Sequence, residues 1–216
     1  MMSLYRVLMG GALLLMLGTA HALEGKKIFD AGGMQPGATA CMACHGADGL
    51  GLAAAGFPRL AGLPAGYLSK QLQDFRDGTR TNPVMQPLAK ALTDEEIAAV
   101  TQVLAAMPVP GAVTAFRSAL PGSPAQKLAL QGAWDRQIPA CVSCHGPAGV
   151  GVGDAFPPLA GQSAAYLAGQ LSAWQSGARR NDPNDLMGHI AKSLTPEEIQ
   201  GVASYFASLG VREVKP

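Results

Sequence analysis

The four cysteines of this 216-residue chain all lie in two copies of one short motif, C-x-x-C-H. The copies are Cys41-Met-Ala-Cys44-His45 and Cys141-Val-Ser-Cys144-His145. Two thiols three residues apart on one helical turn can add to the two vinyl groups of a haem, and the adjacent histidine then faces the iron as an axial ligand. The motif therefore predicts two covalently bound haem c groups, with His45 and His145 as iron ligands.

Three other uses of these cysteines fit less well. A zinc site would need four ligands, whereas a Cys-Cys-His trio supplies three. A thioredoxin-like redox pair requires a strand–helix–strand context that the sequence lacks. Plain disulfides would not call for a histidine after each second cysteine. We therefore expect all four thiols to form thioethers to haem.

The second axial ligand decides between an electron carrier and a catalyst. After its motif each copy has a loop that carries one methionine, Met85 or Met187, seven residues before an L-T-x-E-E-I segment. A lone methionine usually fills a core, but this matched placement favours ligation. His189 competes with Met187, although the first copy has no matching histidine. Histidine–methionine ligation raises the haem potential and occupies both axial positions, so the predicted chemistry is one-electron transfer.

The segments that must position these residues also occur twice. They are CMACHG and CVSCHG, FPRLAG and FPPLAG, and LTDEEI and LTPEEI, at offsets between 99 and 102 residues. Such self-similarity indicates a tandem duplication. We expect an N-terminal domain at 23–112 and a C-terminal domain at 113–216, joined by a Pro/Gly-rich linker at about 108–124.

The expected fold is all-α. Apolar residues share one helix face near the end of each copy, namely Ile97, Val100, Val103, Leu104 and Met107 in the first and Ile199, Val202, Phe206 and Leu209 in the second. Both helices begin with a capping box, formed by Thr93 with Glu96 and by Thr195 with Glu198. Segments 63–77 and 162–177 are also predicted to be helices, and strand-like alternation is absent. Each domain should be a few short helices wrapped around one haem.

Composition supports a small folded core that a cofactor completes. Apolar residues make up 48% and charged residues 14%, which argues against disorder. Aromatic residues are only 6%, so a flat apolar porphyrin would supply bulk that the side chains do not. The formal net charge of +1 gives no electrostatic basis for binding nucleic acid.

The first 22 residues have the features of a secretory signal peptide. Arg6 precedes an apolar stretch at 7–17, and Ala20-His-Ala22 matches a small-x-small cleavage signal. The alternative is an uncleaved anchor, which the Gly10-Gly11 pair and the short stretch disfavour. We expect cleavage after Ala22 and export to an oxidising compartment. No apolar run reaches the roughly 18 residues that would span a bilayer.

The order C-x-x-C-H, then P-x-L-x-G, then a late methionine resembles that of class I cytochromes c. The tandem form resembles the dihaem cytochrome c4 family over residues 23–210. This resemblance implies two cytochrome c folds related by a pseudo-twofold axis, with their haem edges close together at the domain interface. It also implies a periplasmic carrier that passes electrons to a terminal haem–copper oxidase.

The resemblance extends to particular residues. His45 and His145 would be the proximal ligands, and Met85 and Met187 the distal ones. Pro58 and Pro157 match the proline whose carbonyl accepts the Nδ1–H of the ligand histidine, the alternative being a proline that only turns the chain.

Two further pairs of candidate residues occupy equivalent positions in the repeat. Arg80 and Arg179 follow a glycine turn in each copy and would pair with haem propionates, unless they are solvated surface residues. Tyr67 and Tyr166 would line the haem or pack the helix, and the sequence does not decide between these roles.

One segment breaks the repeat. The stretch between Gly177 and Met187 is three residues longer than its counterpart and adds Asp182 and Asp185. We therefore expect the two haems to differ in environment and potential.

Three functions are compatible with these residues. The first is an electron carrier with redox proteins as partners, the donor being a quinol-oxidising complex or a dehydrogenase and the acceptor a terminal oxidase. The second is the electron-transfer subunit of a flavocytochrome or other periplasmic dehydrogenase. The third, an enzyme in its own right such as a dihaem peroxidase or a thiosulfate dehydrogenase, would need one haem iron to be open. We expect an electron-transfer protein rather than an enzyme, and peripheral association with a membrane stays open.

Overall fold

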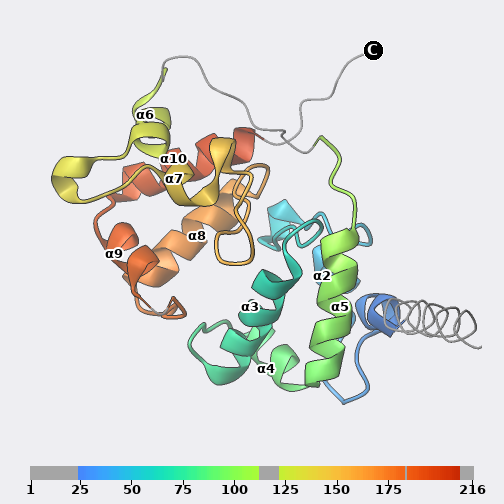
Figure 1. Cartoon of the computed structure of the whole chain (residues 1–216). Coiled ribbons are helices and arrows are strands. Elements are labelled where there is room, and N and C mark those ends of the chain that lie inside the picture. Colours follow the sequence, from blue (N-terminus) through green and yellow to red (C-terminus); the bar gives the residue numbers. More distant parts are fainter. Residues whose placement is uncertain (1–23, 112–121, 183, 210–216) are drawn as a thin grey trace, which may run out of the picture.

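The computed structural model describes residues 24–111, 122–182 and 184–209 (Figure 1). The predicted signal peptide and positions 112–121 of the predicted linker lie outside these ranges. Regular structure in the described ranges consists of helices, with isolated β-bridges and no named strand. None of the helices described is long and apolar enough to cross a membrane. The prediction of an all-α fold is confirmed.

The two halves repeat one order of α-helices, with short 3-10 turns between them. The first half contains a helix at residues 24–31, α2 (Met42–His45), η1 (Ala53–Ala55), α3 (Ala65–Asp77), α4 (Met85–Lys90) and α5 (Asp94–Ala106). The second contains α6 (Pro124–Gln131), η2 (Trp134–Arg136), α7 (Cys141–His145), η3 (Pro147–Gly149), α8 (Ala164–Gln175), α9 (Leu186–Lys192) and α10 (Pro196–Ser208). Figure 1 shows them gathered in two groups, as a tandem duplication predicts.

Local chemistry explains where the helices begin. Both predicted capping boxes are present, so the side chains of Thr93 and Thr195 accept the N–H groups of Glu96 and Glu198 and those glutamates reach back. Helix α3 begins at Ala65, two residues later than predicted, because Pro64 is extended at φ −55° and ψ 135°. Helix α6 begins inside the predicted linker, because the Ser123 side chain caps it.

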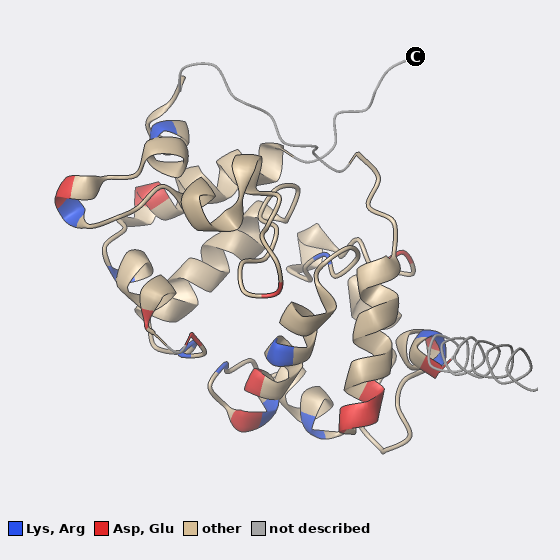
Figure 2. Ribbon diagram, in the orientation of Figure 1, with Lys and Arg blue, Asp and Glu red and all other residues tan. Residues whose placement is uncertain are grey.

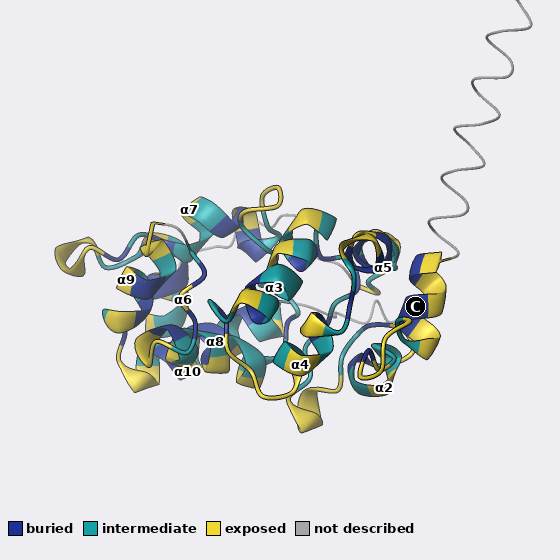
Figure 3. Cartoon of the chain, turned by 90° about the horizontal axis from the view of Figure 1, so that it is seen from below, coloured by how far each residue is buried: buried dark blue, intermediate teal, exposed yellow. Residues whose placement is uncertain are grey.

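Each half has its own apolar core. In the first, Ile97, Val100 and Leu104 of α5 pack with Phe29 and Leu68. In the second, the equivalent core joins α6, α8 and α10 through Leu128, Ala168, Ile199 and Val202, and Leu194 from the segment before α10 adds to it. Buried residues lie on the inner sides of the helices and exposed ones mainly on the outer sides and loops (Figure 3). Acidic and basic residues are interspersed over both halves (Figure 2).

Candidate cofactor sites in the two domains

Each C-x-x-C-H motif forms a single helical turn. The His45 N–H donates to the Cys41 carbonyl at 2.9 Å, and the next residue, Gly46, ends the turn with a φ of 80°. Helix α7 repeats this arrangement, with Gly146 at a φ of 78°. A side chain would be strained at these φ values, which glycine adopts freely. The turn therefore places the two thiols and the histidine of each motif together.

A proline carbonyl fixes each motif histidine. The Nδ1 atoms of His45 and His145 lie 2.9 and 2.8 Å from the carbonyl oxygens of Pro58 and Pro157. Because a carbonyl only accepts, Nδ1 carries the proton and Nε2 keeps its lone pair. Burial lowers the pKa of both histidines, against the opposing effect of the carbonyl bond, and so favours neutral rings.

The Nε2 atom of His45 is positioned for an iron. It is buried and has no hydrogen-bond partner in the part of the chain that the structure describes. A buried polar atom without a partner is costly unless something binds it. The atom lies at the wall of a cavity, so an iron ligand is the use that fits.

A cavity adjoins each motif. The first has a volume of about 690 Å³ and is lined by Cys41, Cys44, His45 and Met85 among others. The second, of about 440 Å³, is lined by their counterparts Cys141, Cys144, His145 and Met187. Each domain thus brings the four predicted attachment and ligand residues around one largely apolar space, which fits a haem.

The cysteines are free thiols in this structure. Burial raises the pKa of Cys41 and of Cys141 to about 11, so both are protonated at neutral pH. The zinc alternative finds no support, because among the described residues no three His, Cys, Asp or Glu side chains gather as a metal site.

The methionines lie at helix starts rather than in loops. Met85 is the first residue of α4 and Met187 the second of α9. The Asn82 side chain accepts the Met85 N–H at 2.9 Å, and the Asp182 carboxylate accepts the Met187 N–H at 2.5 Å. These side chains satisfy backbone donors and so start a helix that the Pro/Gly-rich sequence did not suggest. His189 is exposed and does not line the second cavity.

Arg80 and Arg179 lie at the interface between the domains, and both are only 6% exposed. The Arg80 guanidinium lies 4.5 Å above the Phe75 ring, and that of Arg179 lies 3.8 Å above the Trp174 ring. Neither is a solvated surface residue, so that alternative is wrong.

The two guanidiniums are held by neutral side chains. Arg80 donates to Gln71, Tyr166 and Gln170, and Arg179 to Asn181, Gln170 and Gln71. Within the described ranges no carboxylate forms an ion pair with either. A buried charge needs compensation. Arg80 lines the first cavity and Arg179 lines both, so a cofactor that brings its own carboxylates, such as haem, fits here.

The two cavities share a wall. The residues that line both are Leu63, Tyr67, Gln71, Tyr166, Gln170 and Arg179. Tyr67 and Tyr166 are therefore cavity-lining residues at the interface, which decides the choice that the sequence left open. Gln71 and Gln170 occupy equivalent positions of the repeat, and no sequence motif indicated their role.

Equivalent residues of the two copies meet at this interface. Arg80 and Arg179 form an antiparallel bridge with each other, although they are 99 positions apart. Contact between a residue and its own repeat counterpart is the relation that a twofold axis produces. Two helical domains of one design, each with a covalent haem site, define a dihaem c-type cytochrome.

Comparison with known proteins leads to the same class of protein. The cytochrome c family model matches residues 22–107 and 131–210, and the chain belongs to the cytochrome c family. It is a dihaem electron carrier with two covalently bound haem c groups. The chain is 57% identical, over 99% of both chains, to a thiosulfate dehydrogenase electron acceptor of Stutzerimonas stutzeri. It is 39% identical to cytochrome c4 of Pseudomonas aeruginosa, covering 89% of this chain and 92% of that protein.

Solved structures give the same fold. A thiosulfate dehydrogenase (TsdBA) from Marichromatium purpuratum matches with a TM-score of 0.77 and 44% identity, over 86% of this chain and 39% of that one. Reduced cytochrome c4 from Pseudomonas stutzeri matches with a TM-score of 0.68 and 33% identity, over 78% of this chain and 93% of that one. The resemblance to tandem cytochromes of the c4 type is confirmed.

Proposed function

We propose that this protein is the periplasmic electron acceptor of a thiosulfate dehydrogenase. The observation that carries the proposal is the 57% identity, end to end, with a protein named for that role. A second protein of that name, from Thiomonas intermedia, is 44% identical over 80% of each chain. The TsdBA structure adds that a segment similar to this chain occurs within one polypeptide with such a dehydrogenase. These relatives favour a dehydrogenase subunit over a carrier that serves mainly an oxidase.

Each haem, when bound, supplies a one-electron redox centre. In this proposal His45 and Met85 hold the first iron and His145 and Met187 the second, while the four cysteines hold the porphyrins. The Pro58 and Pro157 carbonyls keep each imidazole oriented and increase its basicity. The domains are 23–112 and 113–216 after removal of residues 1–22.

The two centres suit the proposed donor. Joining two thiosulfate ions through a new S–S bond releases two electrons, as disulfide formation does in general. Two haems take up one electron each. The shared wall that includes Tyr67 and Tyr166 keeps the cavities adjacent, so an electron accepted in one domain has a short path to the other.

The test is reduction of the oxidised holoprotein by thiosulfate in the presence of a purified thiosulfate dehydrogenase. We expect both haems to be reduced, with absorbance followed in the visible range and tetrathionate formed in proportion. Cytochrome c4 of Pseudomonas aeruginosa serves as the comparison acceptor. Equal rates for the two proteins, or no reduction of this one, would contradict the proposal.

Delivery of electrons to a terminal haem–copper oxidase is the second candidate, and the 39% identity with cytochrome c4 favours it. A membrane fraction containing such an oxidase should then oxidise the reduced protein rapidly. Fast oxidation with slow reduction by the dehydrogenase would make this the main role.

A further inference from the structure

The segments that lead to the two methionines begin at equivalent asparagines. Asn82 and Asn181 are 99 positions apart, the offset that also relates Arg80 to Arg179 and Gln71 to Gln170. Their side chains nevertheless form hydrogen bonds with different parts of the molecule. This difference is the basis of the inference.

Asn82 acts within its own domain. Its Oδ1 atom accepts the N–H groups of Val84 and Met85, both at 2.9 Å. The asparagine therefore fixes the start of α4, where Met85 lies. Neither contact involves the second domain.

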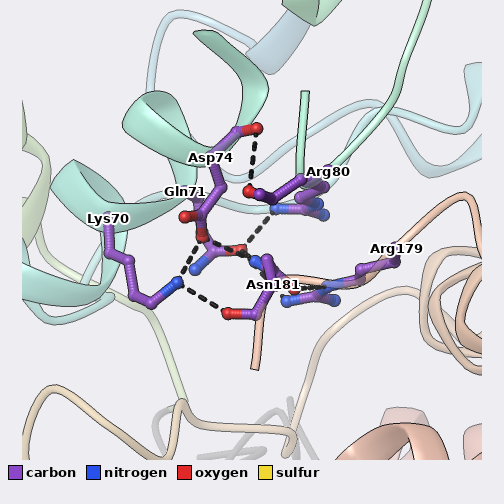
Figure 4. A network of polar contacts seen from close by, with 7 residues as sticks. Lys70, Gln71, Asp74, Arg80, Arg179 and Asn181 are labelled. Carbon is purple, nitrogen blue, oxygen red and sulfur yellow. Dashed lines mark hydrogen bonds and ion pairs between the residues drawn. The ribbon is translucent and has the colours of Figure 1, made fainter. Parts of the chain in front are cut away.

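Asn181 points into the other domain instead (Figure 4). Its Nδ2 atom donates to Asp74 Oδ2 at 2.7 Å and to Gln71 Oε1 at 3.0 Å, both on α3. Its Oδ1 atom accepts from Arg179 at 2.9 Å. The residue is 8% exposed, and all its polar side-chain atoms are engaged. In the second domain it is Asp182, one of the added residues, whose carboxylate accepts the Met187 N–H.

A lysine completes the contact from α3. The Lys70 ammonium donates to the Asn181 carbonyl at 2.7 Å and pairs with Asp74 at 2.6 Å. Asp74 is thus held between an ammonium and an amide and is 9% exposed. Hydrogen bonds to a charged group of this kind are stronger than those between neutral groups.

Helix α8 of the second domain has no counterpart of the Lys70–Asp74 arrangement. The repeat counterparts of Lys70 and Asp74 are Gly169 and Ala173 on α8, and neither has a polar side chain. Across the interface the first segment is held by the Thr81 N–H and hydroxyl, which donate to the Ala178 carbonyl, and by the Arg80 guanidinium, which donates to Tyr166 and Gln170 of α8. What the first domain adds is the Lys70–Asp74 pair, which binds Asn181 just before the Met187 segment, and α8 of the second domain has no equivalent pair.

We propose that α3 of the first domain positions the segment carrying Met187, through Asp74 and Asn181, whereas Met85 is positioned by its own domain through Asn82. Asp74 lines neither cavity. It is a positioning residue that acts on the second haem from the first domain. The inference rests on the proposed assignment of Met187 as an iron ligand.

The decisive variant is Asp74→Ala, which gives α3 the residue found at this position in α8. In the oxidised holoprotein we expect the Met-to-iron charge-transfer absorption of one haem to be lost and that of the other to remain. The ferrous protein should bind carbon monoxide at the second haem, and the midpoint potential of that haem should fall. Asp74→Asn keeps an acceptor oxygen for Asn181 and should behave nearly as the wild type.

Matched variants separate positioning from charge and from stability. Asp77→Ala removes an exposed carboxylate from the same helix and should change neither the absorption nor the midpoints. Asn181→Ala alters no charge and should reproduce the effect of Asp74→Ala, which keeps the test valid if Asp74→Ala yields no holoprotein. Thermal unfolding of each variant reports stability separately.

Two outcomes would overturn the inference. One is an Asp74→Ala protein in which both midpoints rise together while the Met-to-iron absorption is intact, since this is a charge effect alone. The other is an Asn181→Ala protein with unchanged spectra and midpoints. Met187→Ala identifies which midpoint belongs to the second haem, and if it changes neither haem, the ligand assignment fails rather than the inference.

Discussion

At the scale of single residues, the hydrogen bond from each motif histidine to a proline carbonyl prepares the ring for iron. Donation from Nδ1 selects the tautomer whose lone pair is on Nε2, and it keeps the imidazole from rotating. The same bond is present in both domains, at 2.9 and 2.8 Å. In the proposed ligand set, Met85 and Met187 would decide whether each iron keeps an open position.

Replacing Met85 with alanine should open the first iron. We expect a lower midpoint potential for that haem, since the thioether stabilises ferrous iron, and binding of carbon monoxide to the ferrous form. Redox titration and visible spectra measure both. Met34→Ala, which alters a methionine that is 73% exposed in the same domain, is the control. Unchanged midpoints in Met85→Ala would show that another residue is the ligand.

Replacing Cys141 with serine should impair haem attachment in the second domain alone. The remaining thiol can form a single thioether, so we expect a smaller yield of protein carrying two haems. Intact mass and the pyridine haemochrome spectrum measure the stoichiometry and the number of thioethers. Ser143→Ala, inside the same motif, should leave both unchanged. A Cys141→Ser protein with two normal haems would contradict the assignment.

At the scale of elements, the capping boxes of α5 and α10 differ in their surroundings. Glu96 is 4% exposed and also accepts the Met34 N–H at 2.7 Å, which ties the start of α5 to an upstream loop. Glu198 instead pairs with Arg136 at 2.6 Å. Hydrogen bonds from Arg136, stronger here than burial, hold the pKa of Glu198 below its ordinary value of 4.5. The helices α5 and α10 therefore begin in the same way, but different neighbouring residues hold their first turns.

Glu198→Gln should remove a pH-dependent part of the stability. Because the folded-state pKa is lowered, the stabilisation is complete above pH 4.5 and is lost as the pH falls through the lowered value. We expect the variant to lose about 0.5 kcal/mol in the free energy of unfolding at neutral pH, as for a partly exposed ion pair, and less in acid. Urea unfolding at several pH values measures this.

Glu95→Gln in the first turn of α5 is the control, because Glu95 is exposed and belongs to neither capping box. A difference between Glu198→Gln and the wild type that stays constant with pH would argue against the role of the Arg136 pair.

At the scale of the whole molecule, the interface is built from polar groups of both domains. Besides the contacts around Arg80 and Arg179, the Gln162 side chain accepts the Arg59 N–H and donates to the Arg59 carbonyl, both at 3.0 Å. Arg59 also donates to the Ala160 carbonyl at 3.2 Å. Gln162 and Arg59 are 3% and 7% exposed. Such buried polar pairs are specific, because breaking one leaves the other groups unsatisfied.

Gln162→Ala should weaken the joining of the domains. It leaves the backbone N–H and carbonyl of Arg59 buried without partners, at a cost of about 2 kcal/mol. We expect calorimetry of the holoprotein to show unfolding that is less cooperative between the domains. Gln102→Ala, on the exposed side of α5, should leave the transition unchanged. A single transition at the wild-type temperature in Gln162→Ala would contradict this role.

The sequence predicted the features that are local or repeated, and it missed the contacts between the two domains. The haem motifs, the duplication and the capping boxes depend on spacings of a few residues or on one constant offset. The contacts of Asn181 with Gln71 and Asp74 join residues 110 and 107 positions apart. No hydrophobic period or turn signal encodes such a pairing, and Gln71, Asp74 and Asn181 have no chemistry of their own that would single them out. The start of α4 at Met85 was missed because the group that accepts its first N–H groups is the Asn82 side chain, in a Pro-rich segment.

The two asparagines make the halves unequal in what each needs to position its own methionine. In the first domain Asn82 accepts the Met85 N–H, so the support comes from within the domain. In the second domain Asp182, part of the longer stretch, accepts the Met187 N–H, while Asn181 binds Gln71 and Asp74 of the first domain. Surface loops tolerate length differences of this size easily. A difference of three residues is thus enough to make two similar halves a directed pair, in which one half positions its own methionine segment and the other depends on its neighbour.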